Sequence, residues 1–301
     1  MSSSLQDQAN WEAGTLGFLQ RQLFRYPTPV PKSVDLRRQT GIVTGANVGL
    51  GFEALRQLLQ LGLSRGILAV RNQGKGDAAA NILRKEFPNA QIDVMILDLA
   101  SYQSIRSFVK NCEALQRLDI VILNAGMQTV RFEQNKQTGH EVTLQINYLS
   151  TMLLSALLLP VLKAKKQPGQ PSRLSVVSSD TSYWSKLRPV GPLLLTFNKE
   201  ENFDMMGTYS STKLMLTAGI KKLAEYINSE DVIVNTVNPG LCTGTDLSRE
   251  LTGFPITLLL PAFVRLFGRG VKSGASTYIN GAVVQGKESH GSYCSDWTIK
   301  P

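Results

Sequence analysis

Cysteine and histidine are scarce in this sequence, and their scarcity excludes several kinds of protein. Its 301 residues contain three cysteines, Cys112, Cys242 and Cys294, and two histidines, His140 and His290. Three widely spaced cysteines cannot build a disulfide framework, so a reducing compartment, the cytoplasm, is the expected location. With so few histidine and cysteine ligands, no metal site is expected.

Long hydrophobic runs and an apolar leader are also missing. The first ten residues are polar and include Asp7, so no secretory signal is predicted. The longest apolar stretch, 254–267, is interrupted by Pro255, Pro261 and Arg265 and is too short to cross a bilayer. Hydrophobic residues still make up 43% of the chain, so it can bury a sizeable core, and neither a transmembrane segment nor wholesale disorder is predicted.

Acidic residues are outnumbered, since 32 lysines and arginines face 23 aspartates and glutamates and give a net charge of +9. Such an excess is typical of proteins that bind nucleic acid, anionic membranes or phosphorylated small molecules. The only local basic cluster, Lys163, Lys165 and Lys166, contains no aromatic residues and adjoins the sequence Gln-Pro-Gly-Gln-Pro. It is interpreted as a solvated turn, and no nucleic-acid partner is expected.

What the chain does have, after residue 38, is a regular alternation of strand-like and helical segments. Runs rich in Val, Ile and Leu predict strands at 41–44, 67–70, 92–97, 119–123, 173–178, 232–237 and 291–295. Strands without polar alternation are buried on both faces, and the helices between them favour right-handed parallel units. The sequence therefore predicts an α/β fold, a doubly wound parallel sheet in a single domain over 39–301, preceded by a helical arm over 1–38. An apolar stripe in the arm is expected to pack on the body or on a neighbour: Trp11, Leu16, Leu19 and Leu23.

A glycine-rich turn follows the first predicted strand and leads into a helix. Its spacing, G-x-x-x-G-x-G, lets the backbone turn tightly and approach a pyrophosphate, while the N-terminus of the helix offers free N–H groups to the anion. The candidate cofactor-binding residues of this turn are Thr44, Gly45, Asn47, Gly49, Leu50 and Gly51.

The end of the second strand indicates which dinucleotide binds. A site that prefers NAD usually has an acid there, but here Arg71 follows Val70. A guanidinium suits the 2′-phosphate of NADP(H), so NADP(H) is the predicted cofactor. The alternative is that Arg71 is a surface arginine on a loop.

The next two strand ends supply further candidate cofactor contacts. Asp98 and Leu99 end the third strand, where the carboxylate can accept a hydrogen bond from an adenine amino group or cap the following helix, although Ser101 is the better cap. The fourth strand ends in small residues that leave room for a ribose: Asn124, Ala125 and Gly126.

Candidate reaction-centre residues come later in the chain. Tyr209 and Lys213 are four residues apart on a predicted helix, so the phenol and the ammonium share one face. One such pair could be an ordinary surface pair. It gains weight because it follows the glycine-rich turn, an Asn-Ala-Gly strand end and a strand that ends in Ser178-Ser179.

In this order the motifs resemble those of the short-chain dehydrogenase/reductase family, over about residues 39–297. The resemblance implies a Rossmann fold and an NADP-dependent oxidoreductase that acts on CH–OH or C=O groups. It implies four catalytic residues: Asn147, which holds a water for proton relay, Ser179, the acid/base Tyr209, and its partner Lys213. It also implies a segment flanking the nicotinamide, Pro239 and Gly240, followed by Thr243 or Thr245. Whether Ser178 or Ser179 is the catalytic serine stays open, with Ser179 preferred because Ser178 ends the strand.

A closer resemblance is to the retinol-dehydrogenase-like and WW-domain-oxidoreductase-like branch, especially its fungal members from secondary-metabolite pathways. Residues 44–47, 71–72, 146–149 and 290–293 carry it. The sequence departs from the family pattern at Leu123, which replaces the first Asn of Asn-Asn-Ala-Gly, and in an extra segment before the tyrosine.

The resemblance implies hydride transfer between the nicotinamide and a carbonyl carbon, with Tyr209 giving or taking the proton. A free tyrosine has a pKa of about 10. A Lys213 ammonium at ~5 Å contributes about 3 kcal/mol at an effective dielectric constant near 20, so we expect it to lower the pKa of Tyr209.

Two segments, about 182–207 and 243–270, are predicted to form a substrate lid. The first contains Trp184, Leu193, Leu194, Leu195 and Phe197, and the second contains Phe254, Ile256, Leu258, Leu259, Leu260, Phe263, Leu266 and Phe267. For the second segment, ordinary core and contact with a lipid surface are the alternatives. A bulky apolar carbonyl or alcohol is the expected substrate: a polyketide, terpenoid, retinoid or steroid. The rival function is a cofactor-binding protein without redox chemistry, such as an isomerase, cyclase or regulator. The family suggests a homodimer or a monomer.

Overall fold

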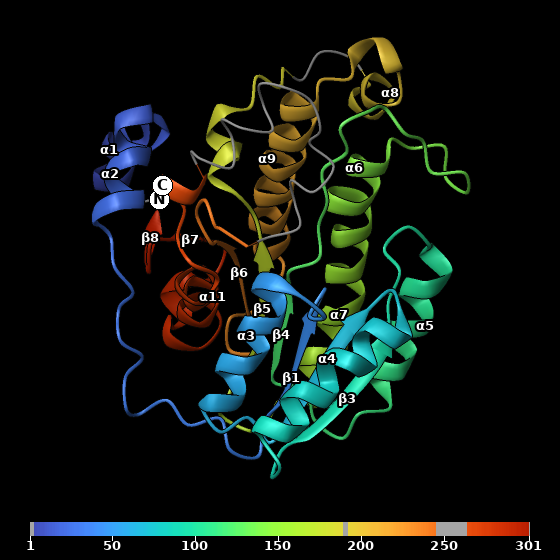
Figure 1. The fold of residues 1–301 in the computed structure, drawn as a ribbon, viewed down its shortest axis with the longest axis vertical. Helices are drawn as coiled ribbons and strands as arrows, with labels where there is room; N and C mark the ends of the chain where they lie inside the picture. The colour runs from blue at the N-terminus through green and yellow to red at the C-terminus, as the bar shows by residue number, and fades with distance from the viewer. Residues whose placement is uncertain (1–2, 189–191, 245–263, 301) are drawn as a thin grey trace.

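Apolar, β-branched runs form the strands at the centre of the protein. A computed structural model describes residues 3–188, 192–244 and 264–300. Within these residues eight strands make one sheet in the order β3-β2-β1-β4-β5-β6-β7-β8 (Figure 1). The strands are β1 (Thr40–Thr44), β2 (Arg65–Val70), β3 (Gln91–Ile96), β4 (Ile120–Leu123), β5 (Ser172–Val177), β6 (Val232–Asn238), β7 (Tyr293–Ser295) and β8 (Thr298–Lys300).

The strand directions confirm the predicted doubly wound sheet. Neighbouring strands from β3 to β7 pair in parallel, and the order reverses between β1 and β4. Ligands bind such sheets at the carboxyl ends of the strands, near the point of reversal. The sequence-based prediction missed β8, a three-residue strand that pairs antiparallel with β7 after a turn in which Asp296 and Trp297 both have positive φ.

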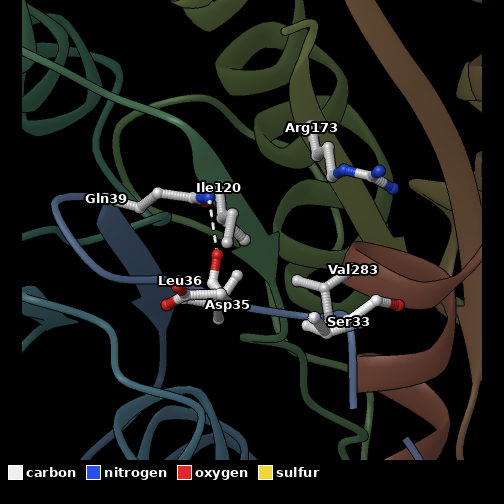
Figure 2. A pocket seen from close by; sticks show the side chains of 8 residues that line it. Ser33, Asp35, Leu36, Gln39, Ile120, Arg173 and Val283 are labelled. Carbon is white, nitrogen blue, oxygen red and sulfur yellow. Dashed lines mark hydrogen bonds between the residues drawn. The ribbon is translucent and has the colours of Figure 1, made fainter. Parts of the chain in front are cut away.

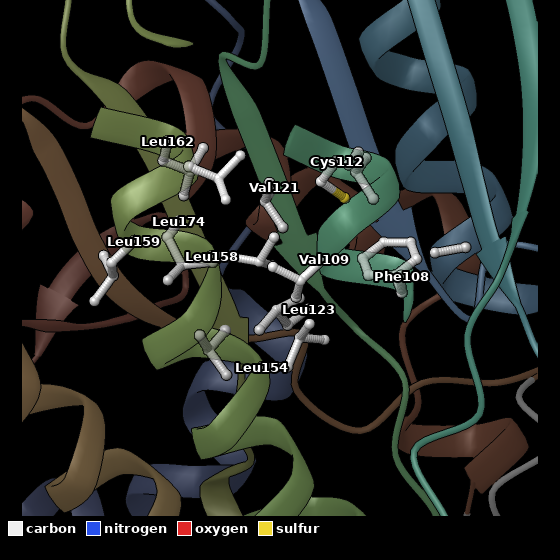
Figure 3. Packing of buried hydrophobic residues seen from close by; sticks show 14 of the residues in the cluster. Phe108, Val109, Cys112, Val121, Leu123, Leu154, Leu158, Leu159, Leu162 and Leu174 are labelled. Carbon is white, nitrogen blue, oxygen red and sulfur yellow. The ribbon is translucent and has the colours of Figure 1, made fainter. Parts of the chain in front are cut away.

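Helices cover both faces of the sheet and bury an apolar cluster against each. One face carries α3 (Gly49–Gln60), α4 (Gln73–Glu86) and α11 (Val271–Ile279). The other carries α5 (Tyr102–Glu113), α7 (Thr151–Lys165) and α9 (Met205–Ala224). Figure 3 shows Phe108 and Val109 of α5, Leu158 of α7 and Val121 of β4, which belong to one apolar cluster. The shorter helical segments are α6 (Val142–Leu144), η1 (Gln145–Ser150), η2 (Asp180–Trp184), α8 (Leu193–Phe197), η3 (Glu200–Asn202), η5 (Asn280–Val284) and η6 (Lys287–Ser289).

The stretch Val142–Lys165, which runs through α6, η1 and α7, is the one described helix long and apolar enough to cross a membrane. Its most apolar window is 56% buried inside the protein. In α7, the side chains of Leu154, Leu158 and Leu162 belong to the apolar cluster against the sheet (Figure 3). Burial of this kind is typical of a core helix in a globular protein.

The N-terminal arm consists of two helices, α1 (Ser3–Ala13) and α2 (Thr15–Phe24), joined to β1 by an extended segment along the outside of the body (Figure 1). The arm packs on the body, but the predicted apolar stripe does not face it, since Trp11 is 50% exposed and Leu16 is 71% exposed. Instead α2 buries Phe18, Arg21 and Gln22. The prediction that the stripe packs on the body was wrong because the body presents polar and charged groups at this place, and packing on a neighbour stays a prediction.

Both described cavities lie at the amino ends of the strands. The first is lined by residues that precede β1, from Ser33 to Gln39, together with Ile120, Arg173 and Val283 (Figure 2). The second shares Gln39, Ile120 and Arg173 with it. Parallel strands bring the predicted site residues to the opposite edge, so neither cavity is the candidate site.

Candidate active site

The glycine-rich turn between β1 and α3 has the shape that its sequence predicts. Gly45 and Gly49 both have positive φ, 64° and 60°. A Cβ on Gly51 would lie 2.6 Å from the carbonyl oxygen of Gly45, so only glycine fits where the helix crosses the turn. The N-cap of α3, Val48, offers no side-chain acceptor to the first turn. The first N–H groups of α3 thus receive no side-chain cap from Val48, and uncapped N–H groups at a helix N-terminus are suited to bind a pyrophosphate.

Thr44 and Asn124 hold the ends of β1 and β4 together. The Asn124 amide donates to the Thr44 carbonyl at 2.9 Å, and the Thr44 hydroxyl accepts from the backbone N–H of Ala125 at 2.9 Å. A Cβ on Gly45 would lie 3.2 Å from the Cα of Ala125, which shows how closely the two strand ends approach. Both side chains therefore shape the floor of the turn. Asn47 and Leu50 are half-buried beside it.

Arg71 is exposed directly after β2, at the end predicted for a 2′-phosphate contact. The next residue, Asn72, caps α4 by accepting a hydrogen bond from the backbone of Lys75 at 2.9 Å. The structure shows no ion-pair partner for Arg71 within the described ranges. Arg71 thus directly precedes the N-cap of α4 and is exposed, as a ligand contact at this strand end requires.

At the end of β3 the cap of the following helix is Ser101 and not Asp98, and the contact of Asp98 with an adenine stays a prediction. Ser101 caps α5, accepting from the backbone of Ser104 at 3.2 Å. Asp98 is half-buried and accepts from the backbone of Ala100 at 2.9 Å, so one of its oxygens already has a partner. Leu99 is buried, and its carbonyl accepts from the Ser150 hydroxyl at 2.5 Å.

The serine that faces the phenol is Ser179. Ser178 is 2% exposed, and its hydroxyl lies 2.6 Å from that of Thr217 and 3.3 Å from the carbonyl of Lys213. Ser178 is therefore taken up in the packing of β5 against α9. Ser179 is half-buried and forms a side-chain hydrogen bond with Tyr209.

Lys213 and Asn147 converge beside Tyr209. The Lys213 ammonium donates to the carbonyl of Val177 at 2.9 Å and lies 5.8 Å from the centre of the Tyr209 ring. A Cβ on Gly126 would lie 3.2 Å from Asn147 Oδ1 and 3.4 Å from Lys213 Nζ. The ends of β4 and β5, with η1 and α9, thus bring together the serine, tyrosine, lysine and asparagine that the sequence predicts.

The amide of Asn147 bonds the chain that follows β4 and also donates to the Thr212 hydroxyl of α9 at 3.3 Å. Its oxygen accepts from the backbone N–H of Met127 at 2.9 Å, and its nitrogen donates to the Met127 carbonyl at 2.8 Å. Asn147 lies in η1, a π-helical segment, and such segments are frequent at functional sites. The apolar periodicity of 141–161 gives no sign of this local change in helix type.

Burial sets the protonation of the tyrosine and the lysine. Burial raises the pKa of Tyr209 to about 12, although the hydrogen bond from Ser179 opposes the rise. Burial also lowers the pKa of Lys213 to about 8. The expected lowering of the pKa of Tyr209 is therefore wrong in direction, because loss of hydration is the largest cause of its shift and the group that opposes the rise is Ser179.

The far wall of the site follows β6. Gly240 has a φ of 74°, and a Cβ there would lie 2.4 Å from the Gln22 side-chain oxygen. The carbonyl of Pro239 lies 3.5 Å from the Arg269 guanidinium. Thr243 donates to the Arg269 carbonyl through its N–H at 2.8 Å and its hydroxyl at 3.3 Å. Thr245, the alternative to Thr243, and the lid residues 245–263 lie outside the described residues.

Sequence reasoning missed two charged residues that reach this site. Asp180, directly after Ser179, is 5% exposed and accepts from Asn238 at 2.5 Å and from the Tyr293 hydroxyl at 3.0 Å. Arg21 reaches it from the arm, with its Nη2 3.5 Å from an Asp180 oxygen. Position next to the serine is a signal for Asp180, but the local sequence holds no comparable signal for Arg21.

The fold and this constellation define a Rossmann-type α/β protein with a serine, a tyrosine and a lysine at one sheet edge. Residues 39–182 match the family described as short chain dehydrogenase. Short chain dehydrogenase virL of Hypocrea virens is 50% identical over 305 residues, covering 100% of this chain and 88% of that protein. Short chain dehydrogenase/reductase mfmJ of Annulohypoxylon moriforme is 44% identical over 295 residues, covering 95% of this chain and 86% of that one.

A solved structure shows the same fold. The RhlG/NADP active-site complex of Pseudomonas aeruginosa matches with a TM-score of 0.65 at 22% identity, covering 87% of this chain and 96% of that chain. The chain belongs to the short-chain dehydrogenase family of oxidoreductases. The predicted fold and family are thereby confirmed.

Proposed function

We propose that this protein is an NADPH-dependent reductase that converts a bulky, apolar ketone to a secondary alcohol. The observation that carries the proposal is the meeting of Ser179, Tyr209 and Lys213 at the strand edge that also holds the glycine-rich turn. The roles of the individual residues follow from their contacts.

The cofactor site fits a phosphorylated dinucleotide. The turn at 45–51 leaves a backbone cradle without side chains, and α3 begins there without a side-chain cap. Arg71 lies exposed at the end of the next strand, where its fork of donors matches a 2′-phosphate. Family relatives crystallised with NADPH include a Sphingobium yanoikuyae short-chain dehydrogenase. When bound, NADPH supplies the hydride.

The protonation of Tyr209 favours the direction of reduction. A phenol with a pKa of about 12 stays neutral at physiological pH, so it holds the proton that a carbonyl oxygen needs as it becomes an alkoxide. Ser179 hydrogen-bonds the phenol and can orient the substrate oxygen beside it. Lys213, with a pKa of about 8, remains largely charged near neutral pH and stabilises the phenolate that forms.

Asn147 has a positioning role in this scheme. Its amide is committed to the backbone of Met127, so it fixes the loop that contains Gly126 next to Lys213.

Exposed apolar side chains support a bulky, apolar substrate. In the predicted lid segment 182–207, Trp184 is 41% exposed, Leu195 is 60% exposed and Met206 is 45% exposed. Apolar groups left open in one segment are typical of a binding surface. We infer that this segment, together with 243–270, covers the substrate, and that the body 39–301 is one domain with 1–38 as its arm.

The first test measures binding of NADPH and of NADH by fluorescence for the wild type and Arg71→Ala. We expect NADPH to bind more tightly than NADH, and Arg71→Ala to weaken NADPH about tenfold or more while leaving NADH unchanged, because the 2′-phosphate loses a charge-assisted contact of about 1.5–3 kcal/mol. Arg106→Ala, on the exposed side of α5, is the matched control.

A panel of bulky ketones is then assayed by loss of NADPH absorbance. Turnover of at least one apolar ketone supports the reductase. If neither dinucleotide binds, the proposed oxidoreductase function is wrong.

A further inference from the structure

Six charged side chains form a buried cluster where the arm meets the body. Three are cations, Arg21, Arg269 and Lys300, and three are anions, Glu12, Asp180 and Asp296. Their side chains are at most 8% exposed. A balanced set of buried charges tolerates the loss of hydration only while every charge keeps its partners.

Arg21 of α2 is the centre of this cluster. Its guanidinium lies 2.7 Å from Glu12, 3.2 Å from Asp296 and 3.5 Å from Asp180. Its backbone carbonyl accepts from Arg269 at 2.9 Å, so the main chain of the arm is fixed as well.

From Arg21 the contacts lead directly to the reaction centre. Asp180 follows Ser179 in the chain, and its backbone N–H donates to the Asn238 side chain at 3.2 Å while Asn238 donates back to its carboxylate at 2.5 Å. The ends of β5 and β6 are thereby locked to each other through one carboxylate. Ser179 directly precedes Asp180, and the segment from Pro239 onward directly follows Asn238.

Gln22, the neighbour of Arg21, holds the same segment from outside. Its amide donates to the carbonyls of Leu241 and Phe267 at 3.0 Å each, and its oxygen accepts from the Leu241 N–H at 3.1 Å. The two described borders of the 245–263 segment are thus tied to one side chain of the arm.

We propose that Arg21 is a positioning residue for the reaction, which acts through Asp180 to hold Ser179 and the segment after β6 in register with Tyr209. The inference rests on the proposed reductase function. It gives the N-terminal arm, which lies outside the family-model match at 39–182, a part in catalysis.

Removal of the Arg21 charge should change the position of Ser179 and leave the cofactor-binding turn unchanged. In Arg21→Met one buried negative charge has no counterpart, and burial already raises the pKa of Asp180 while Arg21 opposes the rise. Asp180 then loses its fixed place against Asn238. A displacement of ~1 Å at a reacting group can cost about 10²-fold in rate.

The experiment compares Arg21→Met, Arg21→Lys, and the double variant Arg21→Met with Asp296→Asn. We expect Arg21→Met to lower kcat about 10- to 100-fold and to leave the Kd for NADPH within about threefold of wild type. Arg21→Lys should recover most of kcat. Arg37→Met, which breaks an exposed ion pair with Asp35 in the linker, is the control and should change neither.

The double variant separates positioning from stability. It restores the charge balance of the cluster, so its melting temperature should recover, but Asp180 still lacks its arginine and kcat should stay low. If kcat recovers together with the melting temperature, or if Arg21→Met keeps wild-type kcat, the proposal is overturned. If Arg21→Met does not fold, the double variant decides.

Backbone hydrogen exchange tests the same proposal without substrate. Faster exchange in peptides covering 178–182 and 238–241 is expected for the double variant relative to wild type. Unchanged exchange there overturns the positioning role. A wild-type protein that reduces no ketone disproves the proposed function instead, and the exchange measurement still decides the role of Arg21.

Discussion

Tyr209 is 7% exposed and Lys213 is 4% exposed, and this burial decides how the two can act. An exposed tyrosine and lysine would have ordinary pKa values and would differ little from a surface pair. Burial instead keeps the phenol neutral and brings the pKa of the amine down to about 8. The pair therefore starts from an acid that holds its proton and a cation close to its titration range, which suits proton donation in a reduction.

Tyr209→Phe tests the acid directly. The variant keeps the ring but loses the proton donor, so kcat for ketone reduction should fall about 10²- to 10⁴-fold, the usual contribution of a positioned acid. NADPH affinity, measured by fluorescence, should stay within about threefold of wild type. Tyr226→Phe removes the hydroxyl of a tyrosine that is 75% exposed and should leave kcat unchanged. A Tyr209→Phe enzyme that keeps more than about a tenth of wild-type kcat would exclude this residue as the acid.

The depressed pKa of Lys213 predicts a pH-dependent stability. Its folded-state pKa of about 8 lies below the ordinary value of 10.5, so between these values the unfolded chain binds more protons. Stability contributed at this residue must therefore rise with pH from about 8 to 10.5, by about 3 kcal/mol in full. Urea unfolding of wild type and of Lys213→Met at pH 7, 8.5 and 10 measures this effect. The free energy of unfolding of wild type, relative to that of the variant, should increase with pH.

The matched control for that series is Lys136→Met, which alters an exposed lysine. Its difference from wild type should stay flat across the three pH values. Measurements stop at pH 10 because the pKa of Tyr209 is raised from 10 to about 12. Above pH 10 its titration therefore lowers the stability as pH rises, opposite to the effect of Lys213. A flat difference for Lys213→Met would show that its amine titrates normally.

At this scale, motif residues could be predicted from sequence and their partners could not. Tyr209, Lys213 and Ser179 were predicted because their order and spacing in the sequence already indicate their chemistry. Arg21 is separated from Asp180 by more than 150 positions, and nothing around it in sequence marks it as buried. The pKa of Tyr209 was predicted in the wrong direction because the pairwise attraction was counted and the loss of hydration was not.

Among the elements, the turn from β1 into α3 depends on the close approach of the backbone of Gly51 to that of Gly45. Gly51→Ala would place a Cβ 2.6 Å from the Gly45 carbonyl and 2.5 Å from the Asn124 amide. We expect a loss of about 1–3 kcal/mol in the free energy of unfolding and weaker NADPH binding, because the helix must shift away from the turn. Chemical denaturation and fluorescence titration measure the two effects.

Gly74→Ala provides the comparison within a neighbouring helix. Its Cβ would meet only the Asn72 side chain, at an ordinary 3.6 Å, so α4 should gain slightly in stability and NADPH binding should not change. Equal effects of the two alanines would show that the Gly51 contact is easily relieved.

All seven predicted strands agree with β1 to β7 within two residues at either end, because runs rich in Val, Ile and Leu favour strands. Prediction failed at two places. β8 is too short to show a pattern, and the arm turned polar side chains inward, since Arg21 and Gln22 found charged and backbone partners there.

For the whole molecule, the two ends of the described chain meet (Figure 1). Lys300 next to the C-terminus lies 2.7 Å from Glu12 of α1, with both side chains 8% exposed. The arm, the sheet edge at β8 and the wall of the active site are therefore joined by buried charges as well as by apolar contacts. An arm bound in this way cannot detach without exposing unpaired charges in the body.

Cooperative unfolding of arm and body is the prediction at this scale. Trp184 of η2 donates to the Ala13 carbonyl at 2.9 Å and stacks edge-on against Phe18 at 5.3 Å, while Trp297 lies under the Arg269 guanidinium at 5.0 Å. Tryptophan fluorescence therefore reports the junction, whereas far-UV circular dichroism reports helices and strands throughout. In urea the two signals should give one midpoint, because the shared charges couple the parts. A fluorescence midpoint clearly below the dichroism midpoint would mean that the arm unfolds first and that 1–38 is an independent unit. In that case the contact between Arg21 and Asp180 would break before the sheet unfolds.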